Sequence, residues 1–227
     1  MKSFCIKFSN NHRGVMGIEA GILMIGVVIV AAGLAVVITN SGFETSQKAK
    51  TTIGHGLSDS SGMLKIAGRV FASGHIASSK LNVTAIPLKI GEGTNSVNLA
   101  ESNTAVKYLS NDVELSEIYQ GTINPGVKTS LQSATATAKI FSYIDQNPFV
   151  DNAHPTQTSA FVYWAVNNND NDILDRGERA FLVIVFSQND RPSPLDRMQV
   201  DVSLARGSTF TVERSIPVIN SQNIDLG

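Results

Sequence analysis

Hydrophobic residues are concentrated in the first fifth of the chain, where they form one long uninterrupted segment. No charged residue occurs between Ala20 and Asn40, and the 19 residues from Ala20 to Ile38 are all apolar or glycine. A helix rises about 1.5 Å per residue, so this segment is close to the ~20 residues that cross a bilayer. Positive residues precede it, which predicts a cytoplasmic N-terminus and export of everything after residue 40.

Residues 1–14 contain three basic residues and no acidic residue, and three interpretations of this leader remain open. A secretory signal peptide has an apolar core of about 7–15 residues and a small-residue cleavage site, whereas the segment here is longer and lacks that site. A retained single-pass anchor is the second interpretation. The third places cleavage before the apolar segment, after Arg13-Gly14 and before Val15, as in prepilin-like precursors.

Glu19 is the only charged residue between Val15 and Ile38. An unpaired carboxylate is costly inside a membrane segment, so such a residue is a functional candidate. If cleavage follows Gly14, Glu19 becomes the fifth residue of the mature chain. There it would compensate the new amino terminus, its own or that of a neighbouring subunit, and the positive end of the helix dipole. The alternative is a glutamate in the headgroup layer with no role.

The helix is expected to continue beyond the apolar segment as far as residue 71. Four glycines between residues 42 and 62 weaken it by up to ~1 kcal/mol each, so packing against neighbouring helices is expected to hold it. The later apolar residues are spaced by 4, 7, 3 and 4 residues, which places them on one helical face: Ile53, Leu57, Leu64, Ala67 and Phe71.

From about Ala72 the chain consists of short β-branched and aromatic runs separated by Gly, Asn, Pro and Ser. Their spacing predicts an antiparallel β-sandwich or barrel, with a central strand at the doubly apolar run FLVIVF and a hairpin at Arg206-Gly207. The candidate strands are residues 81–90, 104–110, 134–144, 159–166, 179–187, 198–205 and 208–216. The predicted fold is therefore α+β, with a leader at 1–14, a helix at 15–71 and a β-domain at 72–227.

Composition narrows the functional classes. The chain has 18 Lys and Arg against 19 Asp and Glu, so it lacks the basic surface that a nucleic-acid partner requires. One Cys and four His argue against a disulfide framework and a Cys-rich zinc module. The sequence has no P-loop, G-x-S-x-G or H-E-x-x-H motif, so neither an enzyme nor an organic cofactor is expected. Charged residues are only 16% of the chain, which suits burial against copies of itself.

The densest group of oxygen-bearing side chains is the segment NNNDNDILDRGE, residues 167–178. One register has the ligand spacing 1, 3, 5, 9 and 12 of a calcium loop, with an aspartate where the sharp turn prefers glycine: Asn167, Asn169, Asn171, Asp175 and Glu178. A second register uses Asp170, Asp172 and Asp175. One expectation is therefore that this loop binds Ca²⁺ or another divalent cation. The alternative is a polar loop whose side chains cap their own backbone.

The segment Asn82-Val83-Thr84 is the single N-x-[S/T] sequon of the sequence. It lies in the part that is expected to be exported, where such sequons accept N-linked glycans. Asn82 is therefore a candidate glycosylation site, and the alternative is an asparagine on a strand face.

Three segments resemble archaeal flagellins (archaellins). The first, RGVMGIEAGILMIGVVIVAAGLAVVITNSGFETSQKAK, is similar to the family's N-terminus. The second, GTNSVNLAESNTAVKYLSNDVELSEIY, is similar to the segment that opens the outer β-domain, and FTVERSIPVINSQNIDL is similar to the C-terminal strand pair. The leader would fit any prepilin-like protein, whereas QKAK together with the ERSIP ending makes the resemblance specific. The similarity covers both ends and parts of the middle.

The resemblance implies an extracellular filament subunit that is made as a membrane precursor with a class III signal peptide. A prepilin-type signal peptidase would cleave after Gly14. The helices of identical subunits would then form the filament core, with paralogous archaellins as further partners. An immunoglobulin-like sandwich would face outward. A membrane motor would rotate the filament for swimming, and N-glycosylation at Asn82 would fit the family. The residues expected to mediate assembly are Glu19, Ile22, Leu23, Ile25, Val28, Leu34 and Phe43. The alternatives are an adhesive type IV-like pilin and a membrane-anchored surface binding domain.

Overall fold

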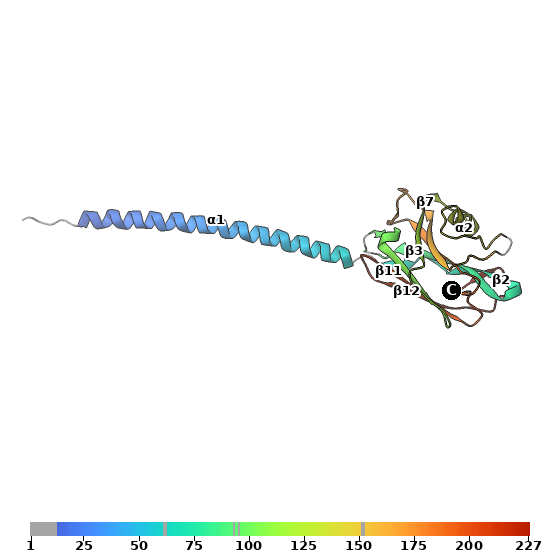
Figure 1. Ribbon diagram of the computed structural model, residues 1–227. Helices are drawn as coiled ribbons and strands as arrows, with labels where there is room; N and C mark the ends of the chain where they lie inside the picture. Colours follow the sequence, from blue (N-terminus) through green and yellow to red (C-terminus); the bar gives the residue numbers. More distant parts are fainter. Residues whose placement is uncertain (1–12, 61–62, 93, 95, 151–152) are drawn as a thin grey trace, which may run out of the picture. The chain divides into compact units, whose positions relative to one another are not determined.

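The computed structural model describes residues 13–60, 63–92, 94, 96–150 and 153–227 (Figure 1), with only the backbone described at residues 13–16 and 53–60. The chain forms two units, Met1–His55 and Gly56–Gly227. The first contains most of one long helix, and the second is the β-domain.

The helix α1 (Arg13–Ser60) is 48 residues long. It contains no proline, so no residue lacks the backbone N–H that the helix needs, although glycine, valine and isoleucine, which are weaker helix formers than alanine or leucine, are its most frequent residues. The apolar helix expected from the sequence is thus confirmed, but the expected end at residue 71 is wrong. Serine and glycine, which are weak helix formers, are frequent near Ser60, and the residues that follow pair with the sheet of the β-domain instead.

Of the apolar residues expected on the helix beyond Ser60, Leu64 and Phe71 lie in strands and Ala67 lies in the connection between them. The strand β1 (Leu64–Ile66) pairs antiparallel with β3 (Lys80–Ile90), with Leu64 opposite Ile90. The strand β2 (Phe71–His75) also pairs with β3, with Phe71 opposite Ala85. Leu64 and Phe71 have helical spacing in the sequence but lie in two different strands. The sheet therefore begins at Leu64 rather than at residue 72.

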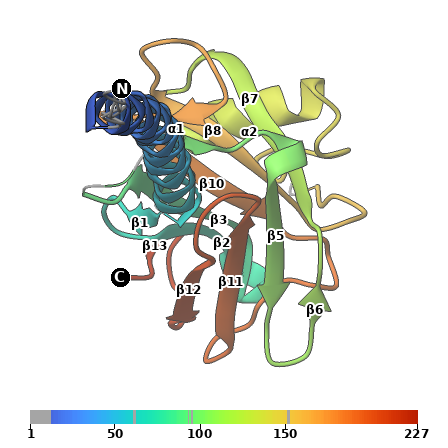
Figure 2. The ribbon, with the colours of Figure 1, turned by 90° about the vertical axis from the view of Figure 1, so that its left-hand side faces the viewer.

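Two sheets face each other in the β-domain, which confirms the expected immunoglobulin-like, mainly antiparallel sandwich (Figure 2). The larger sheet has seven strands in the order β13–β2–β3–β10–β8–β7, with β1 joined to β3. The smaller sheet has four strands in the order β12–β11–β5–β6, and β4 pairs with β9. The bounds of these strands are β4 (Val97–Asn98), β5 (Thr104–Leu109), β6 (Glu114–Leu115), β7 (Tyr119–Val127), β8 (Ser159–Val166), β9 (Ile173–Leu174), β10 (Arg179–Val185), β11 (Arg197–Leu204), β12 (Phe210–Ser215) and β13 (Asn223–Asp225).

The larger sheet separates two apolar clusters. One lies between the two sheets and includes Leu182 from β10 and Val200 from β11. The other lies on the opposite face of the larger sheet, where Phe161 packs with Ala134 and Ala138. Because both of its faces are covered, the larger sheet buries β3, β8 and β10 along most of their length. The strand β10 lies between β3 and β8, so the central position expected for FLVIVF is confirmed.

Residues 134–144, expected as a strand, are instead part of the helix α2 (Leu131–Ile140) and the turn after it, so this expectation is wrong. Ser130 caps the helix, because its Oγ accepts a hydrogen bond from the Ser133 backbone N–H at 3.2 Å. Ala134 and Ala138, one helical turn apart, are fully buried against the larger sheet. The alternation of alanine and threonine imitates a strand, but the burial has the period of a helix.

The strand β7 was not expected from the sequence, and it is the exception to antiparallel pairing. Gly121, Pro125 and Gly126 interrupt its pattern, and the sheet tolerates them because β7 lies at an edge. The helix α2 carries the chain from β7 to β8, and a crossover of this kind allows neighbouring strands to pair in parallel. Tyr119 accordingly lies opposite Ala160 in a parallel register.

The last two expected strands pair as the sequence indicates. The strands β11 and β12 are antiparallel, with Val200 opposite Val212. Their connection is longer than the expected two residues, because β11 ends at Leu204 and β12 begins at Phe210. Gly207 lies in this connection at φ 134°, a conformation that glycine adopts without strain.

Candidate functional site

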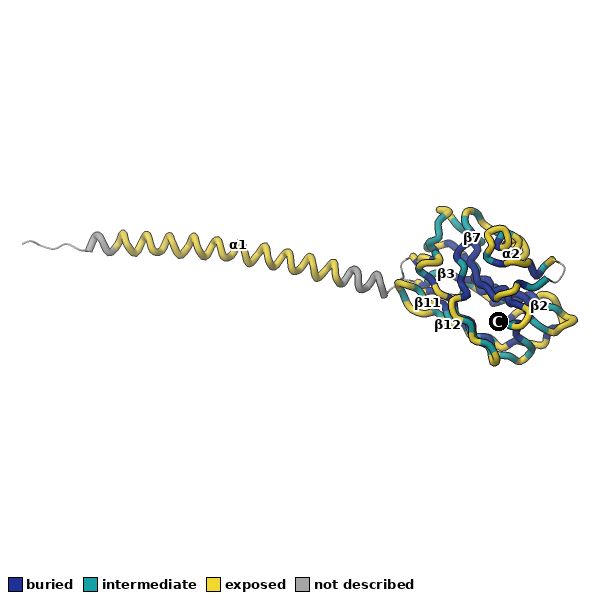
Figure 3. The backbone as a smooth tube through the Cα atoms, viewed as in Figure 1, coloured by how far each residue is buried: buried dark blue, intermediate teal, exposed yellow. Residues whose placement is uncertain are grey.

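The helix α1 carries the largest exposed apolar surface among the described residues. Between Gly17 and Thr52 it is long and apolar enough to cross a membrane, with a mean hydropathy of 2.9 over its most apolar window. None of that window is buried by the chain itself (Figure 3). A helix that is apolar on all sides requires a lipid or protein environment around its whole circumference.

The residues expected to mediate assembly lie on this surface and point in several directions. Successive residues of an α-helix are rotated by about 100°, so Ile22, Leu23 and Val28 point roughly 0°, 100° and 240° around the axis. Their side chains are 62–70% exposed in the single chain. Contact with a single partner helix covers only part of such a surface, so several neighbours are needed. The other members of the set are exposed as well: Glu19, Ile25, Leu34 and Phe43.

Glycines occur within the same apolar stretch and are not required by the fold of this chain. A Cβ atom at Gly21, Gly26 or Gly33 would have no atom within 4 Å to contact. Small residues of this kind allow helices from different chains to approach closely. Their position is therefore consistent with helix–helix contact outside the single chain.

The first charged residue of α1 after its apolar segment is Glu44. Lys48 Nζ lies 2.9 Å from the Glu44 carboxylate, a pair one turn apart with both side chains exposed. Exposed pairs of this kind contribute at most about 0.5 kcal/mol. The change from apolar to paired polar residues marks where the surface suited to a dry environment ends.

The expected cleavage residues lie in the first turn of the helix. Arg13, Gly14 and Val15 belong to the helical backbone, and their side chains are outside the described residues. The leader residues 1–12 are also outside the described part, so cleavage after Gly14 stays a prediction.

The loop 167–178 uses its side-chain oxygens as hydrogen-bond acceptors for its own backbone. The Glu178 carboxylate is buried and accepts from the backbone N–H groups of Asn168 at 2.8 Å and Asp175 at 2.9 Å. Asn167 Oδ1 accepts from the backbone N–H of Asp170 at 2.9 Å. Two further asparagines cap the backbone two residues ahead: Asn169 and Asn171.

The two aspartates in the middle of the loop bind side chains of neighbouring segments. Asp172 Oδ1 accepts from the Thr122 hydroxyl of β7. Asp175 accepts from the Ser96 hydroxyl through Oδ1 and from Asn169 Nδ2 through Oδ2. Among the described residues, no group of three or more Asp, Glu, His or Cys side chains is arranged to hold a metal ion. The geometry favours capping over a calcium loop, and metal binding stays an untested prediction.

Glu178→Ala is expected to lower the free energy of unfolding by about 3 kcal/mol, because it leaves two loop N–H groups without their charged acceptor. Glu178→Gln keeps one acceptor oxygen and is the matched control, with a smaller loss. Thermal melting with and without calcium checks both roles of the loop, and no calcium-dependent shift is expected. A melting temperature that rises with calcium, and no longer does so in Asp172→Ala or Asp175→Ala, would establish the metal site instead.

The candidate glycosylation site is buried in the folded β-domain. Asn82 lies in β3 with an exposed fraction of 5%, and Thr84 of the same sequon is fully buried on the other face, where its hydroxyl contacts Met198. An enzyme cannot reach both residues in the folded domain. Glycan attachment at Asn82 therefore requires modification before β3 folds, and it stays a prediction.

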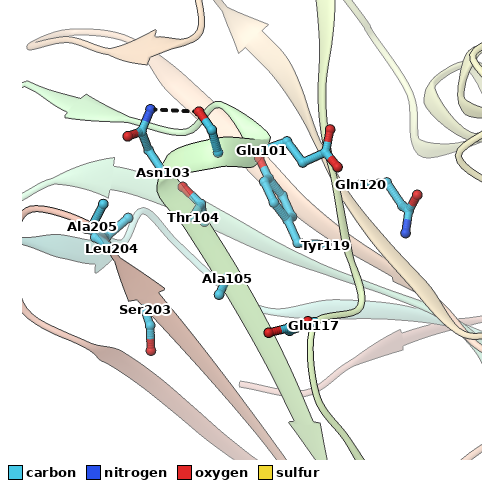
Figure 4. Close-up of a pocket in the computed structure, with 11 residues that line it drawn as sticks. Glu101, Asn103, Thr104, Ala105, Glu117, Tyr119, Gln120, Ser203, Leu204 and Ala205 are labelled. Carbon is cyan, nitrogen blue, oxygen red and sulfur yellow. Dashed lines mark hydrogen bonds between the residues drawn. The ribbon is translucent and has the colours of Figure 1, made fainter.

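A cavity of about 580 Å³ lies beside the start of β5 and the end of β11 (Figure 4). Glu101, Glu117 and Tyr119 line it. The Tyr119 hydroxyl donates to the Leu99 carbonyl, and burial raises the pKa of this hydroxyl well above its usual value. Tyr119 thus remains a protonated donor that holds β7 to the chain before β5. The described lining residues include no nucleophile paired with a base.

Arg191 is a buried charged residue that no sequence pattern indicated. Its exposed fraction is 4%, and its guanidinium donates to the Leu81 carbonyl at 3.2 Å and to Ser78 Oγ at 2.6 Å. It also lies 3.2 Å from His154 Nε2. Burial lowers the pKa of Arg191, and burial together with the positive charge of Arg191 lowers the pKa of His154. The contacts fasten the chain before β11 to the start of β3.

Comparison with known proteins agrees with this architecture over nearly the whole chain. Probable flagellin 1 of Aeropyrum pernix is 30% identical over 210 residues, which cover 91% of this chain and 93% of that protein. Probable flagellin 1 of Archaeoglobus fulgidus is 20% identical over 215 residues, covering 93% and 94%.

Two solved structures share the fold. The archaeal flagellin FlaB1 of Methanocaldococcus jannaschii matches with a TM-score of 0.56 at 12% identity, over 72% of this chain and 95% of that one. The archaeal flagellum of Methanospirillum hungatei matches with a TM-score of 0.50 at 17% identity, over 88% and 93%. The sequence profile described as archaeal-type flagellin extends over residues 14–214, from the expected cleavage glycine to the last strand of the smaller sheet. The apolar helix, the sandwich and this match together show that the chain belongs to the archaeal-type flagellin family.

Proposed function

We propose that this chain is a structural subunit of the archaeal flagellar filament, in which its N-terminal helix packs against the helices of identical subunits. The observation that carries the proposal is the helix α1, whose apolar residues are exposed on every side in the single chain. A protein that keeps such a surface must bury it, and copies of the same helix offer a matching apolar surface. Family membership supports swimming motility as the use of the filament.

The energetics favour a helical core as the main source of cohesion. Full burial of one large aliphatic side chain contributes about 1.5–3 kcal/mol. Many such residues lie between Ile18 and Phe43 with more than half of their surface exposed. The entropy lost on association offsets part of this gain. A head-to-tail arrangement of subunits that does not close on itself then extends as a helical filament.

The precursor would be a membrane protein for a limited time. In this scheme the basic leader holds the N-terminus in the cytoplasm, a prepilin-type signal peptidase cleaves after Gly14, and the helix moves from lipid into the filament. The apolar surface stays out of water in both states, so no large desolvation cost arises on transfer. The membrane motor is the partner that would rotate the assembled filament.

The N-terminal residue of filament protein tests this scheme. Filaments sheared from cells and sequenced from the N-terminus are expected to begin at Val15. A start at Met1 would indicate a retained anchor and contradict the scheme. A strain that lacks the gene is expected to lose swimming, whereas loss of attachment with normal swimming would indicate an adhesive pilin.

A further inference from the structure

A buried arginine joins several segments of the β-domain through its guanidinium group. Arg191 is 4% exposed, and all three of its side-chain nitrogens donate hydrogen bonds. Nε donates to the Leu81 carbonyl at 3.2 Å, Nη2 to Ser78 Oγ at 2.6 Å and Nη1 to Gln188 Oε1 at 3.1 Å. A guanidinium group carries only donors, so each of its partners must supply an acceptor. The same requirement applies to His154, which also contacts Nη1.

His154 is the partner whose ability to accept depends on pH. Its Nε2 atom lies 3.2 Å from Arg191 Nη1. Because arginine cannot accept, Nε2 must hold a free lone pair, and the proton of the neutral ring must be on Nδ1. The protonated ring carries N–H groups at both nitrogens and has no acceptor left. The contact therefore requires a neutral His154, and protonation of the ring breaks it.

The other ring nitrogen of His154 gains no hydrogen bond from the fold. Nδ1 is buried and has no partner among the described residues, so the proton it carries in this tautomer is an unpaired donor, which lowers stability. Several neutral side chains accept hydrogen bonds from arginine. Histidine is the one whose unperturbed charge change lies between about pH 5 and 8. Its presence at this contact makes the contact responsive to acid.

A second histidine lies on the same chain of hydrogen bonds. His75 Nδ1 lies 3.0 Å from Ser78 Oγ, and this hydroxyl accepts from Arg191 Nη2. Two histidines therefore flank one buried guanidinium group, one directly and one through a serine hydroxyl. Acid adds positive charge on both sides of a group that is already a cation, and like charges disfavour the charged form.

The carboxylates of the neighbouring segments are bonded elsewhere. Asp145 accepts from the Thr156 backbone N–H, and Asp190 accepts from the Thr158 hydroxyl. In the described part of the chain, the ion pairs include neither Arg191 nor a histidine. The titratable groups that face His154 from the elements packed against it are thus Arg191 and His75, and neither is negative at any pH.

The electrostatics agree with the geometry. Burial lowers the pKa of His154, and so do the positive charges of Arg191 and His75. In the unfolded chain a histidine titrates near pH ~6.5. Below that pH the unfolded chain binds more protons than the folded chain, so stability falls with the pH. The contribution of His154 to stability is complete above pH ~6.5 and is lost as the pH falls through the lower pKa of the folded chain.

We propose that Arg191 and His154 form an acid-sensitive clamp in the β-domain. At neutral pH and above, the His154 ring holds the chain before β8 to the segment between β10 and β11, and protonation of the ring releases that chain. The release is local, because Arg191 keeps its bonds to the Leu81 carbonyl and to Ser78. The clamp lies within one β-domain, so it does not depend on the filament proposed above.

Nitrogen-15 NMR of the purified chain with labelled histidine tests the tautomer. The neutral His154 ring is expected to carry its proton on Nδ1 and to titrate below the pKa of ~6.5 of free histidine. His154→Gln removes the signals of this ring and so assigns them. A neutral ring that carries its proton on Nε2 would overturn the proposal, because Arg191 would then have no acceptor there.

Hydrogen exchange of the purified chain measures the release. After correction for the intrinsic effect of pH, the backbone amides between residues 153 and 158 are expected to exchange on the order of tenfold faster at about pH 5 than at about pH 7.5. His154→Gln is the matched control, because its amide oxygen can accept from Arg191 at every pH. Little change is expected in this variant. An equal change in both proteins would overturn the proposal.

Thermal melting provides a second measure and separates the two histidines. Between about pH 7.5 and 5, the melting temperature of the wild type is expected to fall about 2–4 °C further than that of His154→Gln. At the higher pH the two proteins are expected to melt at similar temperatures, so the variant is folded. His75→Gln keeps the contact between Arg191 and His154 and is expected to retain most of the acid response. A response that is lost in His75→Gln and complete in His154→Gln would contradict the clamp.

Discussion

Val28→Lys is expected to abolish filament formation while leaving the β-domain folded. Val28 lies in the middle of the apolar part of α1 and is 62% exposed in the single chain, so the lysine causes no clash within one subunit. In the filament, or earlier in the bilayer, its ammonium group would lie in an apolar environment. A lysine at the centre of a membrane helix costs about 2.5–3.5 kcal/mol, and every subunit of the filament would incur a cost of this kind.

Electron microscopy of sheared filaments measures the expected loss, and Val28→Leu is the matched control. Leucine keeps the apolar surface, so normal filaments are expected. Near-ultraviolet circular dichroism of the purified chain, which reports the packing of aromatic side chains in the sandwich, is expected to be unchanged. Filaments of normal length and number from Val28→Lys would show that this part of α1 is not buried in the filament, contrary to the proposed core.

Gly14→Val is expected to leave the leader attached and so to prevent filament formation. A peptidase subsite that fits glycine has no room for the branched side chain, and discrimination against extra methylene groups typically reaches about 10–200-fold per group. The uncleaved chain keeps its three leader cations on the cytoplasmic side, and these hold the helix in the bilayer. Mass spectrometry of membrane and filament fractions measures the proportion of chains that retain residues 1–14.

Two control variants make the cleavage prediction specific to its position. Gly14→Ala adds one methyl group and is expected to slow processing less than Gly14→Val. Gly17→Ala changes a glycine three residues downstream, where a Cβ atom contacts nothing within 4 Å, and it is expected to be processed normally. Complete processing of Gly14→Val would contradict cleavage at this site, and equal slowing in Gly17→Ala would contradict the specific role of Gly14.

Glu19 illustrates why a single chain does not define an assembly site. Its side chain is exposed in α1, and the amino terminus that it was expected to compensate would form only after cleavage. The partner that would explain it is the amino terminus after cleavage or a neighbouring helix. The role of Glu19 in assembly therefore stays a prediction, and so do the roles of the apolar residues around it.

Several elements were predictable because the local pattern and the final environment agree. The apolar helix from Ala20 to Ile38 follows from composition alone. Six of the expected strands correspond to β3, β5, β8, β10, β11 and β12. In β10 the run FLVIVF is apolar on both faces because α2 and the smaller sheet cover the two sides of the larger sheet.

The errors arose where the local pattern fits two structures. The alternation in 134–144 suits a strand, but Ser130 begins a helix, and Ala134 and Ala138 are buried with helical spacing. The strand β7 was missed, because its glycines and proline are unfavourable in most strands and are tolerated here at the edge of the sheet. Which structure forms depends on what packs against the segment, and a short window of sequence does not contain that information.

The sequence by itself determined that one continuous segment must avoid water and that a β-rich domain follows it, because both depend on the composition of neighbouring residues. The tertiary structure decided how individual side chains are used. Glu178 caps a loop, Asn82 is buried at a bulge, and Arg191 is buried against backbone carbonyls. Arg191 shows the reason most clearly, because it donates to the carbonyl of Leu81, a residue 110 positions away in the chain. Hydrogen bonds to such partners are set by the fold rather than by spacing along the chain.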